Sequence, residues 1–118
     1  MRVALDPAML AETPVADLFP IARDTGYDAV ELPNRPDAIA AFGEVAATRD
    51  DLAAARRAAA GAGVEIASVA VIQAWSSPDD DRRREAVARW QDGISAAVEL
   101  GARRLNSELS GDPNMPED

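Results

Sequence analysis

The sequence contains no cysteine, no histidine and no lysine, so all of its basic residues are arginine. Without cysteine the chain can form neither disulfides nor thiolate metal sites, and without histidine it lacks the commonest general base at neutral pH. The absence of lysine excludes Schiff-base chemistry and the lysine of a phosphate-binding P-loop. Any catalysis by this chain would therefore depend on carboxylates.

Basic residues are also outnumbered by acidic ones, and the formal net charge is −9 at pH 7. Nucleic-acid binding draws on clustered basic residues, so we expect no nucleic-acid partner. No apolar segment has the length of a membrane span, and the apolar run from Val3 to Leu5 is too short for a signal peptide. We expect a cytoplasmic protein with no membrane partner.

Aromatic residues make up only 4% of the chain, whereas hydrophobic residues make up 47%. The core must therefore be built from alanine, valine, leucine and isoleucine. At 118 residues the chain is long enough for one modest core, and we expect a single domain over residues 1–118.

Three glycines, Gly26, Gly63 and Gly101, each follow a helix-forming run and precede an apolar run. A residue without a Cβ atom can take the left-handed conformation that ends a helix. The pattern predicts a helix stop that leads into a strand, three times over. Strands separated by single helices are typical of a parallel α/β sheet, whose functional residues lie at the carboxyl ends of the strands.

We expect four strands, at 2–6, 28–32, 64–72 and 103–109. Two starts are open for the first helix: Pro14, which leaves Pro20 inside the helix at a cost of about 3 kcal/mol, or Leu18 with Asp17 as the N-cap.

The later helices have clearer start signals. Thr48 to Asp51 fits a capping box, and Ser77, Pro78 and the acidic residues after them open a third helix. This helix should bury one apolar face, made of Val87, Trp90, Ile94, Ala97 and Val98. A fourth helix is expected to begin at 115–118, where the sequence stops.

The order βαβαβαβ is half of an eight-stranded barrel, and three segments resemble one family. Residues 19–32, which include Gly-Tyr-Asp-Ala-Val-Glu-Leu, are similar to the first helix and second strand of the sugar phosphate isomerase/epimerase family. Residues 58–69 resemble its second helix and third strand, and residues 106–112 resemble its fourth-strand end and the loop after it. The resemblance implies a (β/α)8 TIM barrel of the xylose isomerase-like type, of which this chain would form the first four strands and three helices, with parallel strand order 1-2-3-4.

The family resemblance also implies a chemistry. Its members isomerise or epimerise a small sugar or polyol next to a carbonyl group, and a divalent metal (Mn, Mg, Co or Zn) held by glutamate, aspartate and histidine polarises the substrate. Those ligands come from strands five to eight, so no metal ligand and no catalytic residue is carried over to this chain. We expect the chain to be inactive by itself.

Polar residues at the expected strand ends are the candidate substrate contacts. They are Asp6, Glu31, Gln73, Asn106 and Glu108. Three of them have an ordinary structural alternative: Asp6 can cap the turn at Pro7, Glu31 can pair with Arg35, and Asn106 can bond to nearby backbone. Trp75 could stack on a sugar, although covering the barrel rim is the simpler role.

Two other classes of protein compete with the enzyme reading. The chain could be a non-catalytic half-barrel that acts as a binding or assembly module, or a complete flavodoxin-like domain. Strand order separates the last from the other two, because a doubly wound sheet would have the order 2-1-3-4.

A half-barrel leaves two strand edges and its inner face open to water. We therefore expect self-association or pairing with a complementary carboxyl-terminal half. The apolar residues proposed for that open face are Val3, Leu5, Val30, Val69, Val71 and Leu105.

Overall fold

The computed structural model describes residues 1–34, 47–73 and 75–107, in which strands and helices alternate. The elements, in chain order, are β1 (Ala4–Leu5), the 3-10 helix η1 (Pro7–Leu10), α1 (Val15–Asp24), β2 (Ala29–Asn34), α2 (Arg49–Ala62), β3 (Glu65–Val71), α3 (Asp80–Leu100) and β4 (Leu105–Asn106). The expected fourth helix at 115–118 and the end of the expected strand at 103–109 lie outside the described residues.

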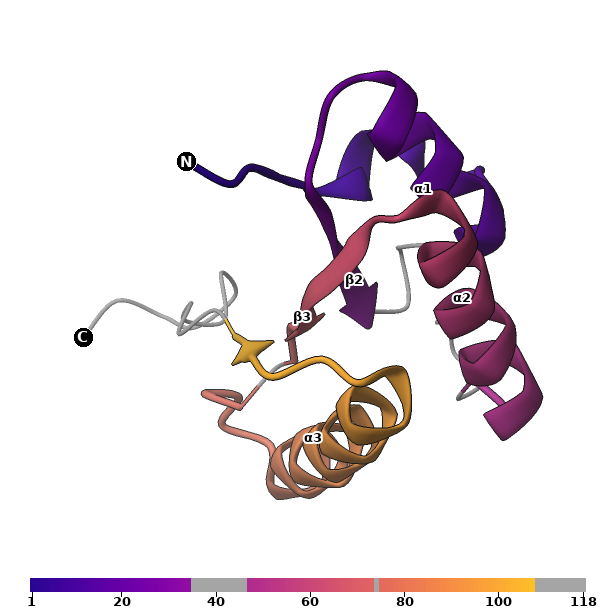
Figure 1. Ribbon diagram of the computed structural model, residues 1–118. Coiled ribbons are helices and arrows are strands. Elements are labelled where there is room, and N and C mark those ends of the chain that lie inside the picture. The colour runs from indigo at the N-terminus through magenta and orange to yellow at the C-terminus, as the bar shows by residue number, and fades with distance from the viewer. Residues whose placement is uncertain (35–46, 74, 108–118) are drawn as a thin grey trace.

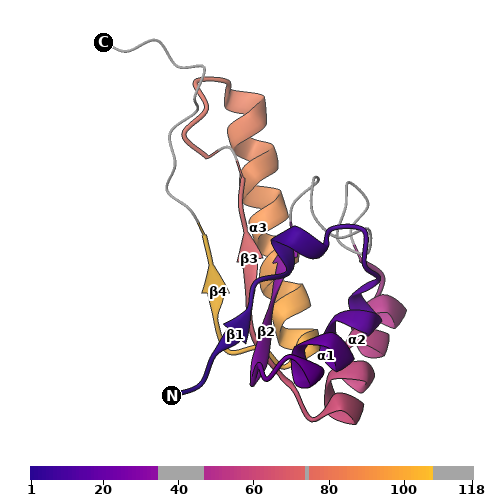
Figure 2. The same ribbon diagram turned by 90° about the horizontal axis from the view of Figure 1, so that it is seen from above.

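The four strands form one parallel sheet with the order β1-β2-β3-β4 (Figure 1). The three α-helices lie on one side of this sheet (Figure 2). The sequential order is that of half a TIM barrel, as predicted, and it excludes the doubly wound alternative. The central strands β2 and β3 have six and seven residues, whereas β1 and β4, which among the described residues have a neighbouring strand on one side only, have two.

Local signals set the helix starts. α1 begins at Val15 with Pro20 inside it, so the longer of the two alternatives is correct and Asp17 lies in the first turn instead of capping the helix. At α2 the predicted capping box is present, because the Thr48 hydroxyl accepts from the Asp51 N–H and the Asp51 carboxylate accepts from the Thr48 N–H. α3 is capped by Asp79, two residues after Ser77, the residue with which its expected start signal began.

Left-handed glycines end two helices and follow the third, as the sequence predicted. Gly63 and Gly101 are the C-caps of α2 and α3, with φ of 69° and 75°, and Gly26 after α1 has φ of 85°. A side chain at any of these positions would be strained, because L-residues other than glycine avoid this region.

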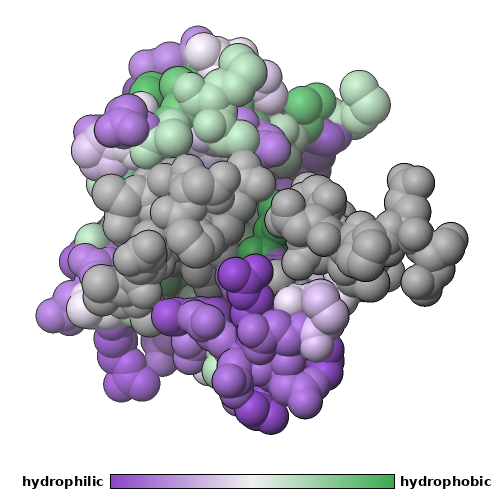
Figure 3. All heavy atoms as spheres, turned by 180° about the vertical axis from the view of Figure 1, so that it is seen from behind, coloured by the Kyte–Doolittle hydropathy of each residue, from purple (hydrophilic) through white to green (hydrophobic). Residues whose placement is uncertain are grey.

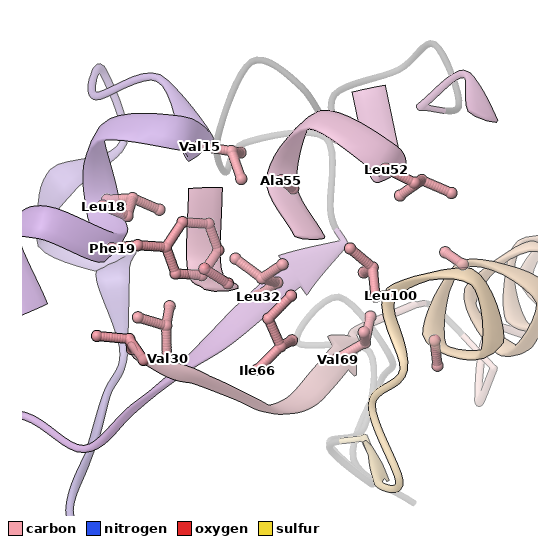
Figure 4. Close-up of a cluster of buried hydrophobic side chains, with 14 of the residues drawn as sticks. Val15, Leu18, Phe19, Val30, Leu32, Leu52, Ala55, Ile66, Val69 and Leu100 are labelled. Carbon is pink, nitrogen blue, oxygen red and sulfur yellow. The ribbon is translucent and has the colours of Figure 1, made fainter. Parts of the chain in front are cut away.

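The hydrophobic core fills the space between the sheet and the helices (Figure 4). Leu18 and Phe19 of α1 and Leu32 of β2 are completely buried there. Val30, Val69 and Val71 are also completely buried in this layer, and Leu5 and Leu105 pack against it, so the proposal that these five residues line the open face was wrong. Only Val3 of that set is exposed, at 44%.

The opposite face of the sheet carries small and polar side chains. Residues paired across neighbouring parallel strands point to the same side. The pairs on this face include Ala4 with Ala29, Glu31 with Ser68, and Ala70 with Asn106. We call it the inner face, because it would line the interior of a closed barrel.

A register irregularity in the pairing of β2 with β3 decides which residues reach the inner face. Val30 pairs with Ile66, but the next residue of β2, Glu31, pairs with Ser68, so β3 contains one extra residue at Ala67. The bulge returns Ser68 to the side of Glu31 while Ile66 and Val69 both remain in the core.

The apolar residues of α3 divide between two directions. Ala97 is buried and Trp90 packs against the core, as predicted. Val87, Ile94 and Val98 are 53%, 48% and 73% exposed, so the prediction that they share the buried face was wrong. Four of the five buried residues of α3 are alanine or glycine and the fifth is Leu100, and the small side chains let the helix approach the sheet closely.

In the part of the chain that the structure describes, no helix is long and apolar enough to cross a membrane. Seen from behind, the lower part of the molecule, where α3 lies in Figure 1, is mainly hydrophilic (Figure 3).

Candidate functional site

Three polar side chains from three neighbouring strands meet on the inner face. Glu31 of β2, Ser68 of β3 and Asn106 of β4 form what we call the inner-face trio. The Ser68 hydroxyl and the Asn106 side-chain amide both donate to Oε2 of Glu31, and the same amide lies 3.4 Å from the Ser68 oxygen. The trio therefore joins positions that are up to 75 residues apart in sequence.

The two carboxylate oxygens of Glu31 have different surroundings. Oε2 accepts both protein hydrogen bonds. Oε1 receives no hydrogen bond from the described residues, and the Glu31 side chain is only half-buried. A carboxylate held in this way can still accept a hydrogen bond from a ligand hydroxyl.

Glu31 lies farther from the carboxyl end of its strand than the sequence analysis expected. The expected strand ended at residue 32, which placed Glu31 next to the carboxyl end, but β2 continues to Asn34. Glu31 is thus the third of six residues, and its partner Ser68 is also near the middle of β3. Glu31 and Ser68 therefore lie below the rim where their strands end, whereas Asn106 is the last residue of β4.

Ser68 was missed by the sequence analysis. It is 4% exposed and is one of two buried polar residues of the described chain. It is the one hydroxyl residue in the apolar run from Val64 to Ile72, and this polar exception was the available signal. Its direction depends on the bulge at Ala67, which the sequence does not reveal.

The other candidates do not join the trio through hydrogen bonds among the described residues. Asp6 is the N-cap of η1 and accepts from the Ala8 N–H at 3.0 Å, which is its structural alternative. Gln73 follows β3 and is half-buried, and its carbonyl accepts from the Trp75 N–H at 2.9 Å. Glu108 lies outside the described residues, as does Arg35, the alternative partner of Glu31.

Near the amino-terminal end of α3 there is a shallow hollow of about 560 Å³. Its lining residues are Trp75, Asp80, Arg83, Arg84 and Val87. Arg83 pairs with Asp80, and Arg84 pairs with Asp81, so both guanidinium groups are engaged within the helix. Trp75 packs against Trp90, with ring centroids 5.2 Å apart. This contact gives Trp75 a structural role, which is to cover the core.

Two carboxylates at helix starts, Asp79 and Asp51, have lowered pKa values. Hydrogen bonds from the Arg82 and Asp81 N–H groups lower the pKa of Asp79, with smaller contributions from nearby arginine charges. The Thr48 hydroxyl and N–H lower the pKa of Asp51 in the same way. These carboxylates stabilise helices, and nothing in their surroundings indicates a catalytic task.

The side chains that could ligate a metal ion are carboxylates, hydroxyls and amides. Among residues 1–34, 47–73 and 75–107, no three acidic side chains lie close enough together to share a metal ion. The trio offers one carboxylate, one hydroxyl and one amide, and two of its donors already bond to that carboxylate. The described residues therefore do not fit the metal centre that the family implies.

Comparison with known proteins agrees with this architecture. Residues 19–118 match the family of xylose isomerase-like TIM barrels. No curated protein sequence matches the chain. The family match covers most of the chain, and the chain therefore belongs to the xylose isomerase-like TIM-barrel family.

Solved structures with the same fold include three sugar-related proteins. A D-psicose 3-epimerase from Clostridium cellulolyticum H10, solved with D-tagatose, is 19% identical with a TM-score of 0.76 and matches 100% of this chain and 42% of its own. A 3-keto-D-glucoside 4-epimerase from E. coli is 11% identical with a TM-score of 0.69, matching 89% of this chain and 36% of its own. A xylose isomerase domain containing protein from Salmonella typhimurium LT2 is 17% identical with a TM-score of 0.64, matching 88% and 35%.

At these identities the likeness establishes the fold. The chain spans well under half the length of each of these structures, and the part that it spans is a partial barrel.

Proposed function

We propose that this chain supplies the amino-terminal half of a sugar-converting barrel, an isomerase or epimerase that acts next to a carbonyl group. The observation that carries the proposal is the inner-face trio, because one oxygen of its carboxylate has no hydrogen bond from the described residues and the trio lies on the face that would become the barrel interior. Family membership and the epimerase names of two similar structures support the same class of reaction. The substrate would be a small sugar or polyol, with or without a phosphate group.

Within this proposal the residues of the trio have separate tasks. Oε1 of Glu31 accepts a hydrogen bond from a substrate hydroxyl, and Ser68 and Asn106 fix the carboxylate by bonding to Oε2. This arrangement orients a substrate, since a held acceptor costs less entropy on binding than a mobile one. Asp6, Gln73 and Glu108 stay predicted contacts near the strand ends.

The complete barrel would need groups that this chain does not offer. We infer that a divalent metal, when present, is held by the other half, where it would supply Lewis-acid chemistry. The chain alone is then inactive and works by self-association or with a complementary carboxyl-terminal half. The single domain over 1–118 and the cytoplasmic location expected from the sequence also stay predictions.

Sugar binding can be tested on the 118-residue chain by NMR. We expect D-fructose to shift the Asn106 side-chain amide and the backbone amides of Glu31 and Ser68. The substitution Glu31→Gln should weaken binding about tenfold or more, because it replaces a charged acceptor by an amide that donates. The matched variant Glu12→Gln, at an exposed position away from the sheet, should leave it unchanged.

An absence of shifts at the trio, or equal binding by Glu31→Gln, would overturn the proposal. The alternative, a non-catalytic half-barrel that serves only in binding or assembly, would be supported if the chain bound a carboxyl-terminal half but neither half nor the complex converted or bound a sugar.

A further inference from the structure

α3 carries an apolar stripe, Val87, Ile94 and Val98, that faces away from the core. The three residues are 53%, 48% and 73% exposed. Their spacing of seven and four places them on one line along the helix. An exposed line of this kind needs an explanation in a chain whose other large aliphatic residues are mostly buried.

The direction of the stripe follows from helix geometry. Successive residues are turned by about 100°, so the stripe lies roughly 120° around α3 from the mean direction of its five buried residues, which are Ala86, Gly93, Ala96, Ala97 and Leu100. Glu99 lies roughly the same angle away in the opposite sense. Glu99 faces α2, because its carboxylate is 3.1 Å from Arg49 and its carbonyl accepts from Arg56. The stripe therefore faces the flank opposite α2.

This flank lies beside the free edge of the sheet. The order β1-β2-β3-β4 leaves the outer edge of β4 without a neighbouring strand among the described residues. Each successive unit along the chain places its helix next to the preceding one, α1 beside α2 and α2 beside α3. One more unit would place a helix against the stripe.

We propose that the α3 stripe is the docking surface for a helix of the complementary carboxyl-terminal half, packed outside β4. This inference rests on the proposed function, and it decides between the two partners named there. A second copy could pair its β1 with the edge of β4. The α1 helix of that copy would then cover the groove between its own β1 and β2, and not the groove between β4 and the added strand. The groove beside α3, next to β4, would therefore hold no helix of the second copy. Two chains of formal charge −9 would also repel each other.

The experiment uses the absence of cysteine from the chain, which makes an introduced thiol unique. Ile94→Cys would report on the stripe, and Ala88→Cys, at an exposed position on the outer side of α3, is the matched control. The partner probe is the carboxyl-terminal part of the Clostridium cellulolyticum D-psicose 3-epimerase, expressed separately from the helix after its fourth strand onward.

We expect the two halves to bind and the thiol at position 94 to react at least tenfold more slowly in the complex, with no change at position 88. Replacing Val87, Ile94 and Val98 together by glutamine should weaken the binding of the halves at least tenfold. The double variant Ala88→Gln and Ser95→Gln should bind as the original chain does.

Failure of the halves to bind, an unprotected thiol at position 94, or a thiol that is already protected in a self-associated form of this chain would each overturn the inference. The readouts are binding and thiol reactivity. A complex that protects position 94 but binds no sugar would therefore contradict the proposed function alone.

Discussion

Replacing Leu32 by alanine should destabilise the fold by about 2–5 kcal/mol, the range for a large-to-small change in a packed core. Leu32 is completely buried and points into the layer between the sheet and the helices, near Phe19 and Ile66 (Figure 4). Its loss leaves a cavity between three elements, α1, β2 and β3. Since small domains are stable by roughly 5–15 kcal/mol, the change removes a large part of the total.

Urea unfolding, followed by the fluorescence of Trp75 and Trp90, measures this loss directly. Leu32→Met keeps the volume and should cost less than about 1.5 kcal/mol. Val3→Ala, at a residue that is 44% exposed, should cost less than about 1 kcal/mol. A loss below about 1 kcal/mol for Leu32→Ala, with an unchanged dependence on urea, would refute the placement of Leu32 in the core.

Three further predictions concern helix ends. Thr48→Ala removes the capping box of α2 and should cost about 0.5–2 kcal/mol in urea unfolding, whereas Thr48→Ser should cost less. Gly101→Ala forces a side chain into the left-handed region and should cost about 1–2 kcal/mol by the same measurement; a neutral result would contradict the C-cap geometry. The lowered pKa of Asp79 stabilises the fold above the ordinary carboxyl pKa, and this stability is lost as the pH falls through the lower folded value. Melting temperatures of the original chain should thus fall on acidification more steeply than those of Asp79→Asn, and parallel curves would contradict this.

The features that sequence analysis predicted correctly depend on neighbours in the chain. A capping box such as Thr48 to Asp51 and a helix stop such as Gly63 involve residues within one or two turns. The regular return of these signals was enough to predict the parallel order of the sheet, because strands joined by single helices have few alternatives.

The features that it missed depend on contacts between distant segments. The bulge at Ala67 exists only relative to β2, and it alone brings Ser68 to the side of Glu31. The sequence could not show that the α3 stripe lies outside the buried face. A wide apolar arc on a helix has the same periodicity whether one structural element packs against it or two do. The start of α1 was open for a related reason: burial of Leu18 and Phe19 offsets the cost of Pro20 within the helix.

The composition of the inner face changes which surfaces are expected to drive association of this chain with a partner. The sequence analysis placed large aliphatic residues there, but the structure places alanine, serine, asparagine and Glu31 there. Apolar burial on this face is therefore small, and the strand edges and the α3 stripe are the surfaces that a partner would gain most by covering.

Closure of the barrel should also change the energetic role of Ser68. In the chain alone Glu31 is half-buried, so water can replace the lost donor and Ser68→Ala should cost about 0.5–1.5 kcal/mol in urea unfolding. In a complex with a carboxyl-terminal half, water is excluded, and a hydrogen bond to a charged group is worth about 1.5–3 kcal/mol. Ser68→Ala should therefore destabilise the complex more than the chain, whereas Ser95→Ala, at an exposed hydroxyl on α3, should affect both equally. Equal costs of Ser68→Ala in the two states would show that the inner face stays open to water, because only desolvation of the Glu31 carboxylate can make them differ.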